Sequence, residues 1–290
     1  MVDLPAFDQP VFDQPAFDQP VFDVPDTAGV RWSARIVDVD TGERLFEINP
    51  DAVQKTASIG KLFLLIEVAR QAEAGQLSLD ERVDRRTEQP VADSGIWYTL
   101  DSDTMTIDDA CRLIGAVSDN LATNVLIGRI GLAAIDETTA GIGIVRSALL
   151  DRIREERLPQ HPPTLSRGAG GELADLMAGL ARGEVVSADV SARVLGWIGL
   201  NTDLSMVAAA FGLDPLAHLD VDRGILLRNK TGTISTVRAD VGVVTGARRR
   251  LAYAVLAEWT PESPTGVRDD VLAAMRAVGD GIRALVFSAL

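Results

Sequence analysis

Strand-like patterns lie near both ends of this chain, and a long stretch of helical patterns separates them. The first pattern, WSARIVDV at 32–39, is joined by a turn at 40–43 to RLFEI at 44–48, which predicts a β-hairpin because alternating residues flank a glycine-containing turn. Three more strand-like runs come late in the chain, at 224–233, 239–246 and 248–259. If these segments share one sheet, the two ends of the chain must meet in it.

The middle of the chain has the apolar spacing of amphipathic helices. The strongest example, KLFLLIEVARQAEA at 61–74, stops before Gly75, a residue type that commonly ends helices. Five further segments have this spacing, at 106–117, 121–130, 133–140, 171–182 and 187–200. A last helix is predicted over 267–285, where the apolar residues of one face are Val271, Met275, Val278, Ile282 and Leu285.

This order of elements predicts an α+β fold. We expect an antiparallel sheet lobe flanked by helices, made from about 27–60 and 215–290, with an all-helical lobe inserted at about 61–214. The 290 residues are ample chain to bury a core of that size.

The first 26 residues repeat every five positions, and proline, phenylalanine and aspartate each keep a fixed phase. Proline has no N–H and disfavours a helix at the residue before it, so an extended tail is expected at 1–26, ahead of a globular domain at 27–290. Removing the tail should leave stability nearly unchanged. The alternative is that its phenylalanines dock onto the body or onto a partner.

The charge balance is acidic, with 28 Lys and Arg against 42 Asp and Glu and a net charge of −14. Such a chain is a poor partner for a phosphate backbone, so we expect no nucleic acid. No apolar run approaches the roughly 20 residues of a membrane span, and no Lys or Arg opens the chain as in a secretory signal, so a cytoplasmic protein is expected. One cysteine and two distant histidines predict neither a disulfide nor a metal site.

Ser58-Ile59-Gly60-Lys61 places a hydroxyl and an amine three residues apart at the start of the first predicted helix. Residues i and i+3 share a helix face, so the amine can reach the hydroxyl oxygen, and the helix dipole favours negative charge on that oxygen. The alternative is an ordinary helix start with a solvated lysine.

Two further motifs lie at junctions between predicted elements. Ser118-Asp119-Asn120 separates two helices and can direct a hydroxyl and an amide into a cleft, although all three residue types also favour a plain N-cap. Lys230-Thr231-Gly232-Thr233 ends a strand-like run, where N–H groups, a charge and a hydroxyl can hold an acyl substrate. The alternative there is a simple turn.

In this order, Ser-x-x-Lys, Ser-Asp-Asn and Lys-Thr-Gly are the motifs of class A β-lactamases and penicillin-binding proteins. The chain resembles the class A β-lactamase family over about residues 28–290, and the 60 residues from Ser58 to Ser118 and the later Asn124 fit that family too. The resemblance implies a serine hydrolase that opens β-lactams through an acyl-enzyme, with no metal or cofactor.

The resemblance also implies roles for individual residues. Ser58 is the acylated nucleophile, Lys61 accepts or relays its proton, and Ser118 passes a proton to the departing lactam nitrogen. The N–H groups of Ser58 and Thr233 form the oxyanion hole. The remaining residues bind substrate. Asn120 binds the acyl-amide side chain, and Lys230 and Thr231 bind the carboxylate. Arg238 is expected to bind the same carboxylate, and Arg223 and Arg228 are alternatives for that role.

The loop that carries the deacylating glutamate in this family departs from its Glu-x-x-Leu-Asn pattern, since the matching region here reads LLDRIREERLPQHPPTLSR. Without a gap, Arg154 falls on the glutamate. One inserted residue places Glu155 there and aligns Leu158, but Pro159 replaces the asparagine and has no amide to position a water. The alternative for Glu155 and Glu156 is solvated charge. We therefore expect the acyl-enzyme to form readily and to hydrolyse slowly.

The expected partner is a small β-lactam or related acyl substrate, and the expected state is a monomer. Two alternatives stay open, namely a penicillin-binding-protein-like or esterase activity on another amide or ester, and a covalent β-lactam binder without turnover. Trp97 and Tyr98 resemble the aromatic loop at the family's cleft rim, with plain packing as the alternative. Cys111 is expected to be a buried thiol because Leu65 occupies the position of a disulfide partner.

Overall fold

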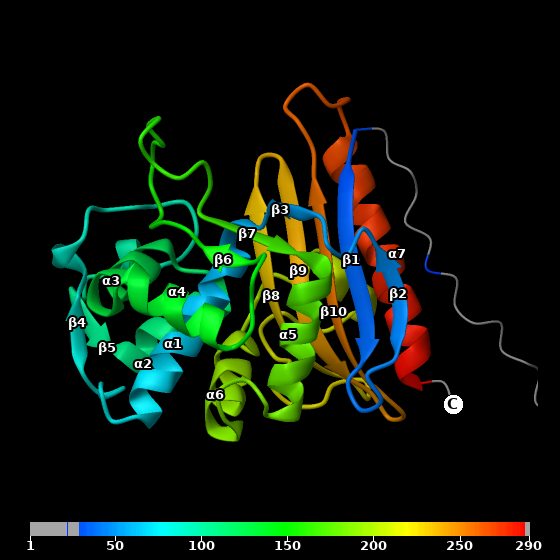
Figure 1. The fold of residues 1–290 in the computed structure, drawn as a ribbon, viewed down its shortest axis with the longest axis horizontal. Coiled ribbons are helices and arrows are strands. Elements are labelled where there is room, and N and C mark those ends of the chain that lie inside the picture. Colours follow the sequence, from blue (N-terminus) through cyan, green and yellow to red (C-terminus); the bar gives the residue numbers. More distant parts are fainter. Residues whose placement is uncertain (1–21, 23–28, 288–290) are drawn as a thin grey trace, which may run out of the picture.

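A five-stranded antiparallel sheet forms one side of the molecule in the computed structural model, which describes residue 22 and residues 29–287 (Figure 1). The remaining residues of the tail predicted at 1–26 lie outside the described part of the chain. The strands, in sheet order, are β2 (Arg44–Ile48), β1 (Arg31–Asp38), β10 (Arg250–Glu258), β9 (Val237–Thr245) and β8 (Leu226–Ile234).

The two ends of the chain meet in this sheet, as the strand patterns predicted. β1 pairs with β10 in an antiparallel register that runs from Arg31 opposite Glu258 to Asp38 opposite Leu251. β1 also pairs with β2, which completes the predicted hairpin, and β8 and β9 form the opposite edge. The predicted α+β architecture is therefore confirmed.

Helices cover both faces of the sheet. α5 (Gly170–Arg182) packs against β1, β9 and β10 on one face, and α7 (Val267–Phe287) packs with the short helix η4 (Val207–Phe211) on the other (Figure 1). Alternate residues of β10 join opposite cores, so its central residues are buried throughout and the strand reads as a continuous apolar run. The predicted apolar face of the last helix is buried at all five positions, Val271, Met275, Val278, Ile282 and Leu285.

A helical lobe lies beside the β8 edge of the sheet, and α1 is its central element (Figure 1). α1 packs against α3, α4 and α6, and its residues from Lys61 to Ala69 are all buried. The helices of this lobe are α1 (Lys61–Glu73), α2 (Ile107–Val117), α3 (Asn120–Ile130), α4 (Leu132–Gly141) and α6 (Ala188–Ile198). Cys111 is a buried free thiol in the core of this lobe, as expected.

Short elements that periodicity did not predict connect the larger ones. Three single-turn helices, η1 (Ala57–Gly60), η2 (Arg85–Thr87) and η3 (Trp97–Thr99), lie before α1 or in the segment that leads to α2. Two small antiparallel sheets use β3 (Val53–Lys55), β7 (Ser166–Ala169) and β6 (Ala148–Leu149) in one, and β4 (Arg82–Asp84) and β5 (Thr104–Thr106) in the other.

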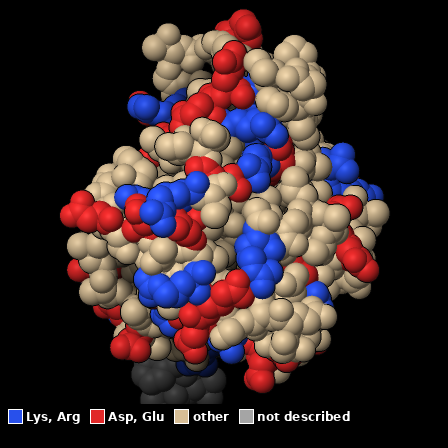
Figure 2. All heavy atoms as spheres, turned by 90° about the vertical axis from the view of Figure 1, so that its left-hand side faces the viewer, with Lys and Arg blue, Asp and Glu red and all other residues tan. Residues whose placement is uncertain are grey.

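The surface of the helical lobe carries both charges side by side, as Figure 2 shows for the face that looks away from the sheet. Ion pairs account for part of this pattern, among them Arg129 with Glu81 at 2.7 Å and Arg112 with Asp108 at 2.7 Å. Among the described residues, no helix is both long enough and apolar enough to cross a membrane.

Phe22, from the last repeat of the tail, packs against the body. Its ring centroid lies 5.1 Å from that of Phe46 on β2, and its ring occupies the space above Gly281 of α7 that a Cβ would fill. The tail thus makes at least one apolar contact with the body. This contact fits the alternative that its phenylalanines dock onto the body, and it was not part of the expectation of an unattached tail.

Phe22→Ala should therefore lower the free energy of unfolding by about 1 kcal/mol, because a half-buried aromatic ring returns to water. For a domain of this size that is a fall of roughly 2–4 °C in Tm, measurable by calorimetry. Phe12→Ala, the same change in an earlier repeat, is the matched control. Equal falls in both variants would mean that the contact with Phe46 is not the source of the stability.

Candidate active site

Ser58 lies in η1, directly before the first turn of α1, which confirms the helix start predicted from the sequence. Ala57, its neighbour, has φ of 48°, a left-handed conformation that a non-glycine residue rarely adopts and that often marks functional sites. Ser58 itself is half-buried, whereas Lys61, one turn further, is completely buried. The predicted alternative of a solvated lysine is therefore wrong.

Gly232 of β8 packs directly against the backbone of η1. A Cβ at this position would overlap the carbonyl oxygen of Thr56 and lie 3.2 Å from the backbone nitrogen of Ser58, so only glycine permits the approach. Thr233, the next residue, is paired with Arg238 at the end of β8. The N–H of Ser58 and the end of β8 at Thr233 are thereby brought to the same place.

Ser118 links α2 to α3, and two buried lysines converge on its side chain. The Nζ atoms of Lys61 and Lys230 each lie 3.1 Å from Ser118 Oγ. Lys61 also donates to the carbonyl oxygen of Ser118 at 2.6 Å and to Oδ1 of Asn120 at 2.8 Å. Ser118 has φ of 54°, and this left-handed turn is what directs both its hydroxyl and its carbonyl toward the lysines.

Asp119 has the structural role that was the alternative for this motif. One carboxylate oxygen accepts the N–H of Ala122 and so caps α3. The other accepts the N–H groups of Ile96 and Trp97, at 2.7 and 2.8 Å, and fixes the segment before α2. Both interpretations of Ser-Asp-Asn are thus realised by different residues, since Ser118 and Asn120 contact the lysine while Asp119 caps the helix.

Burial changes the proton affinity of both lysines. Desolvation, and then the charge of Lys230, hold the pKa of Lys61 well below its ordinary value. Desolvation also lowers the pKa of Lys230 to about 8, opposed by the charges of Asp203 and Asp240. The lowered pKa of Lys61 favours its neutral amine, and a neutral amine can accept a proton from a hydroxyl.

A buried polar network lies behind Lys230. Asn201 donates to Oδ1 of Asn229 at 3.1 Å, and Asn229 and Tyr253 each donate to Oδ1 of Asp240 at 3.0 Å. Desolvation raises the pKa of Asp240 to about 7, although these hydrogen bonds favour the charged form. The network ties β8 next to Lys230 to β9, to β10 and to the segment after α6.

A cavity of about 170 Å³ opens in front of these groups. Its walls come from η1, from the Ser118 turn, from the end of β8 and from the segment after α6. The lining residues are Ser58, Ser94, Ala116, Val117, Ser118, Asn201, Thr202, Asp203, Thr231 and Thr233. The structure thus brings together Ser58, Ser118, Thr231 and Thr233 around one space, with Lys61, Asn120 and Lys230 in contact with Ser118 or with its neighbour.

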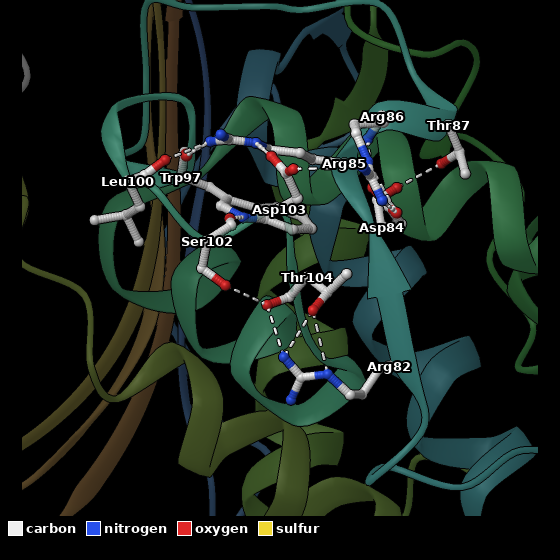
Figure 3. Close-up of polar contacts among 10 residues, drawn as sticks. All are labelled: Arg82, Asp84, Arg85, Arg86, Thr87, Trp97, Leu100, Ser102, Asp103 and Thr104. Carbon is white, nitrogen blue, oxygen red and sulfur yellow. Dashed lines mark hydrogen bonds and ion pairs between the residues drawn. The ribbon is translucent and has the colours of Figure 1, made fainter.

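The segment that contributes Ser94 is anchored by Arg85 (Figure 3). The guanidinium donates to the carbonyl oxygens of Trp97 and Leu100, both at 2.7 Å, and pairs with Asp103 at 3.0 Å. Trp97 is fully buried, so it packs as the alternative proposed, whereas Tyr98 is 44% exposed. These bonds hold in place the loop that contributes Ser94 to the cavity wall.

Asn124 of α3 binds the backbone of the loop predicted to hold a glutamate. Its Oδ1 accepts the N–H of Ile153 at 2.8 Å, and its Nδ2 donates to the carbonyl oxygen of Ile153 at 2.9 Å. Asn120 and Asn124 are four residues apart on α3, so Ile153 is held one helical turn from the contact between Asn120 and Lys61. The residue that Asn124 holds, Ile153, is apolar, and comparison of the loop with the family's pattern did not single it out.

The charged residues of the same loop are directed elsewhere. Arg154 pairs with the buried Asp151 at 2.7 Å, as does Arg157. Glu155 is exposed and accepts the N–H of Ala92 at 2.9 Å. Neither Glu155 nor Arg154 is among the residues that line the cavity, and the role of Glu155 in catalysis stays a prediction.

Arg238 lies on β9 near the end of β8, but it too is absent from the cavity lining. Its Nη1 donates to the carbonyl oxygens of Ile234 and Val237, both at 2.8 Å, and its guanidinium lies 5.8 Å from the ring centroid of Trp259. These contacts hold the turn between β8 and β9. The sequence did not single out Asp203, which does line the cavity. Among the described residues, no three His, Cys, Asp or Glu side chains gather as a metal site would require.

Comparisons with known proteins find the same fold. The solved β-lactamase of Sphaerobacter thermophilus is 26% identical, with a TM-score of 0.76 over 89% of this chain and 92% of that one. PBP-A is 20% identical over 90% of this chain and 92% of its own, with a TM-score of 0.71. A leucine-to-glutamate variant of PBP-A, solved as an acyl-enzyme with penicillin G, has a TM-score of 0.72 at 20% identity over 89% of this chain and 90% of that one.

No curated protein matches the sequence. A model of the beta-lactamase enzyme family matches residues 20–284, which is most of the chain. Together with the fold, this match shows that the protein belongs to the beta-lactamase enzyme family.

Proposed function

We propose that this protein opens β-lactam rings by acyl transfer to Ser58, in the manner of class A enzymes, and releases the product slowly. The observation that carries the proposal is the convergence of the Lys61 and Lys230 amines on Ser118 Oγ at the cavity that Ser58 lines. The family match supports a hydrolase acting on β-lactams, and the acyl-enzyme of the PBP-A variant is a precedent for the covalent step.

In the acylation step, Ser58 Oγ attacks the lactam carbonyl carbon and its proton passes to the neutral amine of Lys61. The negative oxygen that forms accepts hydrogen bonds from the N–H groups of Ser58 and Thr233, which the close approach at Gly232 brings together. The C–N bond then breaks as Ser118 gives its hydroxyl proton to the lactam nitrogen. A proton from Lys61 restores Ser118, which it contacts at 3.1 Å.

Hydrolysis of the ester requires a base that removes a proton from water while the water attacks the carbonyl carbon. Asn124 holds the apolar Ile153 one helical turn from the contact between Asn120 and Lys61, and the exposed Glu155 is engaged with Ala92. These two contacts support the proposal that deacylation is slow.

Intact mass spectrometry over time with penicillin G tests both steps. We expect a rapid gain of the whole penicillin mass, since ring opening loses no atoms, and an adduct that persists for minutes. Glu155→Gln should change the decay rate by less than ten-fold, because its carboxylate binds Ala92 rather than lining the cavity. Glu156→Gln, at the neighbouring exposed acid, is the matched control.

Two outcomes would contradict the proposal. Rapid turnover of a chromogenic cephalosporin with no accumulated adduct would refute slow deacylation, and a 10²–10⁴-fold slower decay in Glu155→Gln would make that residue the base after all. Activity on simple esters without any penicillin adduct would favour the esterase alternative.

A further inference from the structure

We infer that Ser166 is a positioning residue of this site, and that its hydroxyl orients the peptide group whose N–H is proposed to bind the oxyanion. That peptide group joins Ala57 to Ser58, so its carbonyl belongs to the first residue and its N–H to the second. This role rests on the proposed acylation of Ser58. Ser166 itself is not among the residues that line the cavity, so it acts through the backbone.

The hydroxyl of Ser166 binds one end of this peptide group. Ser166 Oγ donates to the carbonyl oxygen of Ala57 at 2.5 Å. Because a trans peptide group is planar, its C=O and its N–H point in opposite directions. A hydrogen bond that fixes the direction of the Ala57 carbonyl therefore also fixes the direction of the Ser58 N–H. The same bond polarises the peptide group, which strengthens its N–H as a donor.

The other end of the peptide group approaches β8. A Cβ added to Gly232 would lie 3.2 Å from the nitrogen of Ser58 and would overlap the carbonyl oxygen of Thr56. The peptide group is thus held between two strands, since β7 binds its oxygen through Ser166 and β8 comes close to its nitrogen. β8 also carries Thr233, whose N–H is the second proposed oxyanion donor.

The backbone at this point needs such support. Ala57 has φ of 48°, a conformation that costs free energy for a residue with a Cβ and persists only where the surroundings stabilise it. Ser166 also contacts the preceding residue, because its carbonyl oxygen accepts the N–H of Thr56 at 3.3 Å and its Oγ lies 2.8 Å from Thr56 Oγ1. The single hydroxyl proton of Ser166 goes to Ala57, so Thr56 is the donor in the contact between the two hydroxyls.

Ser166 is itself firmly placed. It is completely buried, and it pairs with Leu149 of β6 in the small sheet. A Cβ added to Gly60 would lie 2.4 Å from Ser166 Cβ, so the start of α1 closes over it. Removing the hydroxyl therefore leaves the buried carbonyl of Ala57 without this donor, and the peptide group loses the contact that sets its direction.

The dependence of the acylation rate on penicillin G concentration tests this role, measured by intact mass spectrometry for the wild type, Ser166→Ala and Ser191→Ala. Ser191 is the matched control, because it is also completely buried and donates to a backbone carbonyl, that of Val185, at 3.0 Å. We expect Ser166→Ala to lower the maximal rate roughly ten- to a hundred-fold, a part of what the loss of an oxyanion donor costs. Its half-saturating concentration should change less than three-fold, and Ser191→Ala should change neither value.

Two further variants separate orientation of the peptide group from general damage to β7. Ala57→Gly in the Ser166→Ala background should restore the maximal rate by roughly three- to ten-fold, because glycine adopts the left-handed conformation without outside support. Ser166→Cys keeps the packing and only weakens the donor, so it reports on the same bond if the alanine variant does not fold. Its maximal rate should lie between those of the wild type and Ser166→Ala.

Several results would overturn the role of Ser166 and leave the proposed function standing. They are an unchanged maximal rate in Ser166→Ala, an equal loss in Ser191→Ala, a change confined to the half-saturating concentration, and no rescue by Ala57→Gly. The absence of any penicillin adduct on the wild type would overturn both the role of Ser166 and the proposed function.

Discussion

Replacing Ser58 with alanine should abolish the penicillin adduct and reduce acylation by a factor on the order of 10⁶, the scale seen when a catalytic nucleophile is removed. The physical reason is that Ser58 provides the only bond to the acyl group, whereas Lys61, Lys230 and Ser118 act on protons around it. Intact mass after prolonged incubation measures the effect directly.

Ser94→Ala is the matched control, because Ser94, from the loop anchored by Arg85, lines the same cavity. The fold should survive in both variants, since Ser58 is half-buried and its side chain makes no hydrogen bond within the described structure. An undiminished adduct on Ser58→Ala, or its loss only on Ser94→Ala, would show that the nucleophile has been misassigned.

Replacing Ile153 with glutamate should shorten the lifetime of the acyl-enzyme by roughly 10²–10⁴-fold, which is the typical contribution of a general base. Asn124 holds the backbone of residue 153 at both its N–H and its carbonyl, one helical turn from the contact between Asn120 and Lys61. A carboxylate there would supply a general base one helical turn from that contact, where the wild-type residue is apolar.

The measurement is the decay of the penicillin adduct after removal of free penicillin. Ile153→Gln introduces a side chain of nearly the same size and polarity as glutamate but without a basic group. Its adduct should therefore decay at the wild-type rate within a few-fold. Equal acceleration by glutamate and glutamine would indicate that loosening the loop, rather than supplying a base, admits water to the ester.

The long helices and strands could be predicted because the spacing of their apolar residues indicates which face is buried. The helix at 61–74 was expected from apolar spacing and occurs as α1 at Lys61–Glu73, and the last helix buries the face assigned to it. The contacts of Ser118 with two lysines could be predicted only from the order of the three motifs along the chain. Tertiary packing brings these motifs together, and no sequence periodicity shows it.

The loops could not be predicted in the same way. A shift of one residue decides whether Arg154 or Glu155 matches the family's glutamate, and sequence patterns offer no means to choose. The structure instead shows the side-chain amide of Asn124 binding the backbone of Ile153, a contact that does not depend on which residue stands at 153. Asp203 and Arg238 illustrate the same limit, since Asp203 lines the cavity although the sequence did not single it out, and Arg238, which it did, binds the β8–β9 turn instead.

The pairing of β1 with β10 has a consequence for how this molecule acquires its site. Arg31 and Glu258 are neighbours in the register, so the central pair of the sheet closes a loop of more than two hundred residues. Closing such a loop costs chain entropy before any contact repays it, and folds rich in such contacts form slowly. The helical lobe, whose contacts are more local, can collapse earlier, but β8 carries Lys230 and Thr233 and depends on β9 and β10 for its place. During synthesis, the candidate active site is therefore among the last parts of the molecule to form.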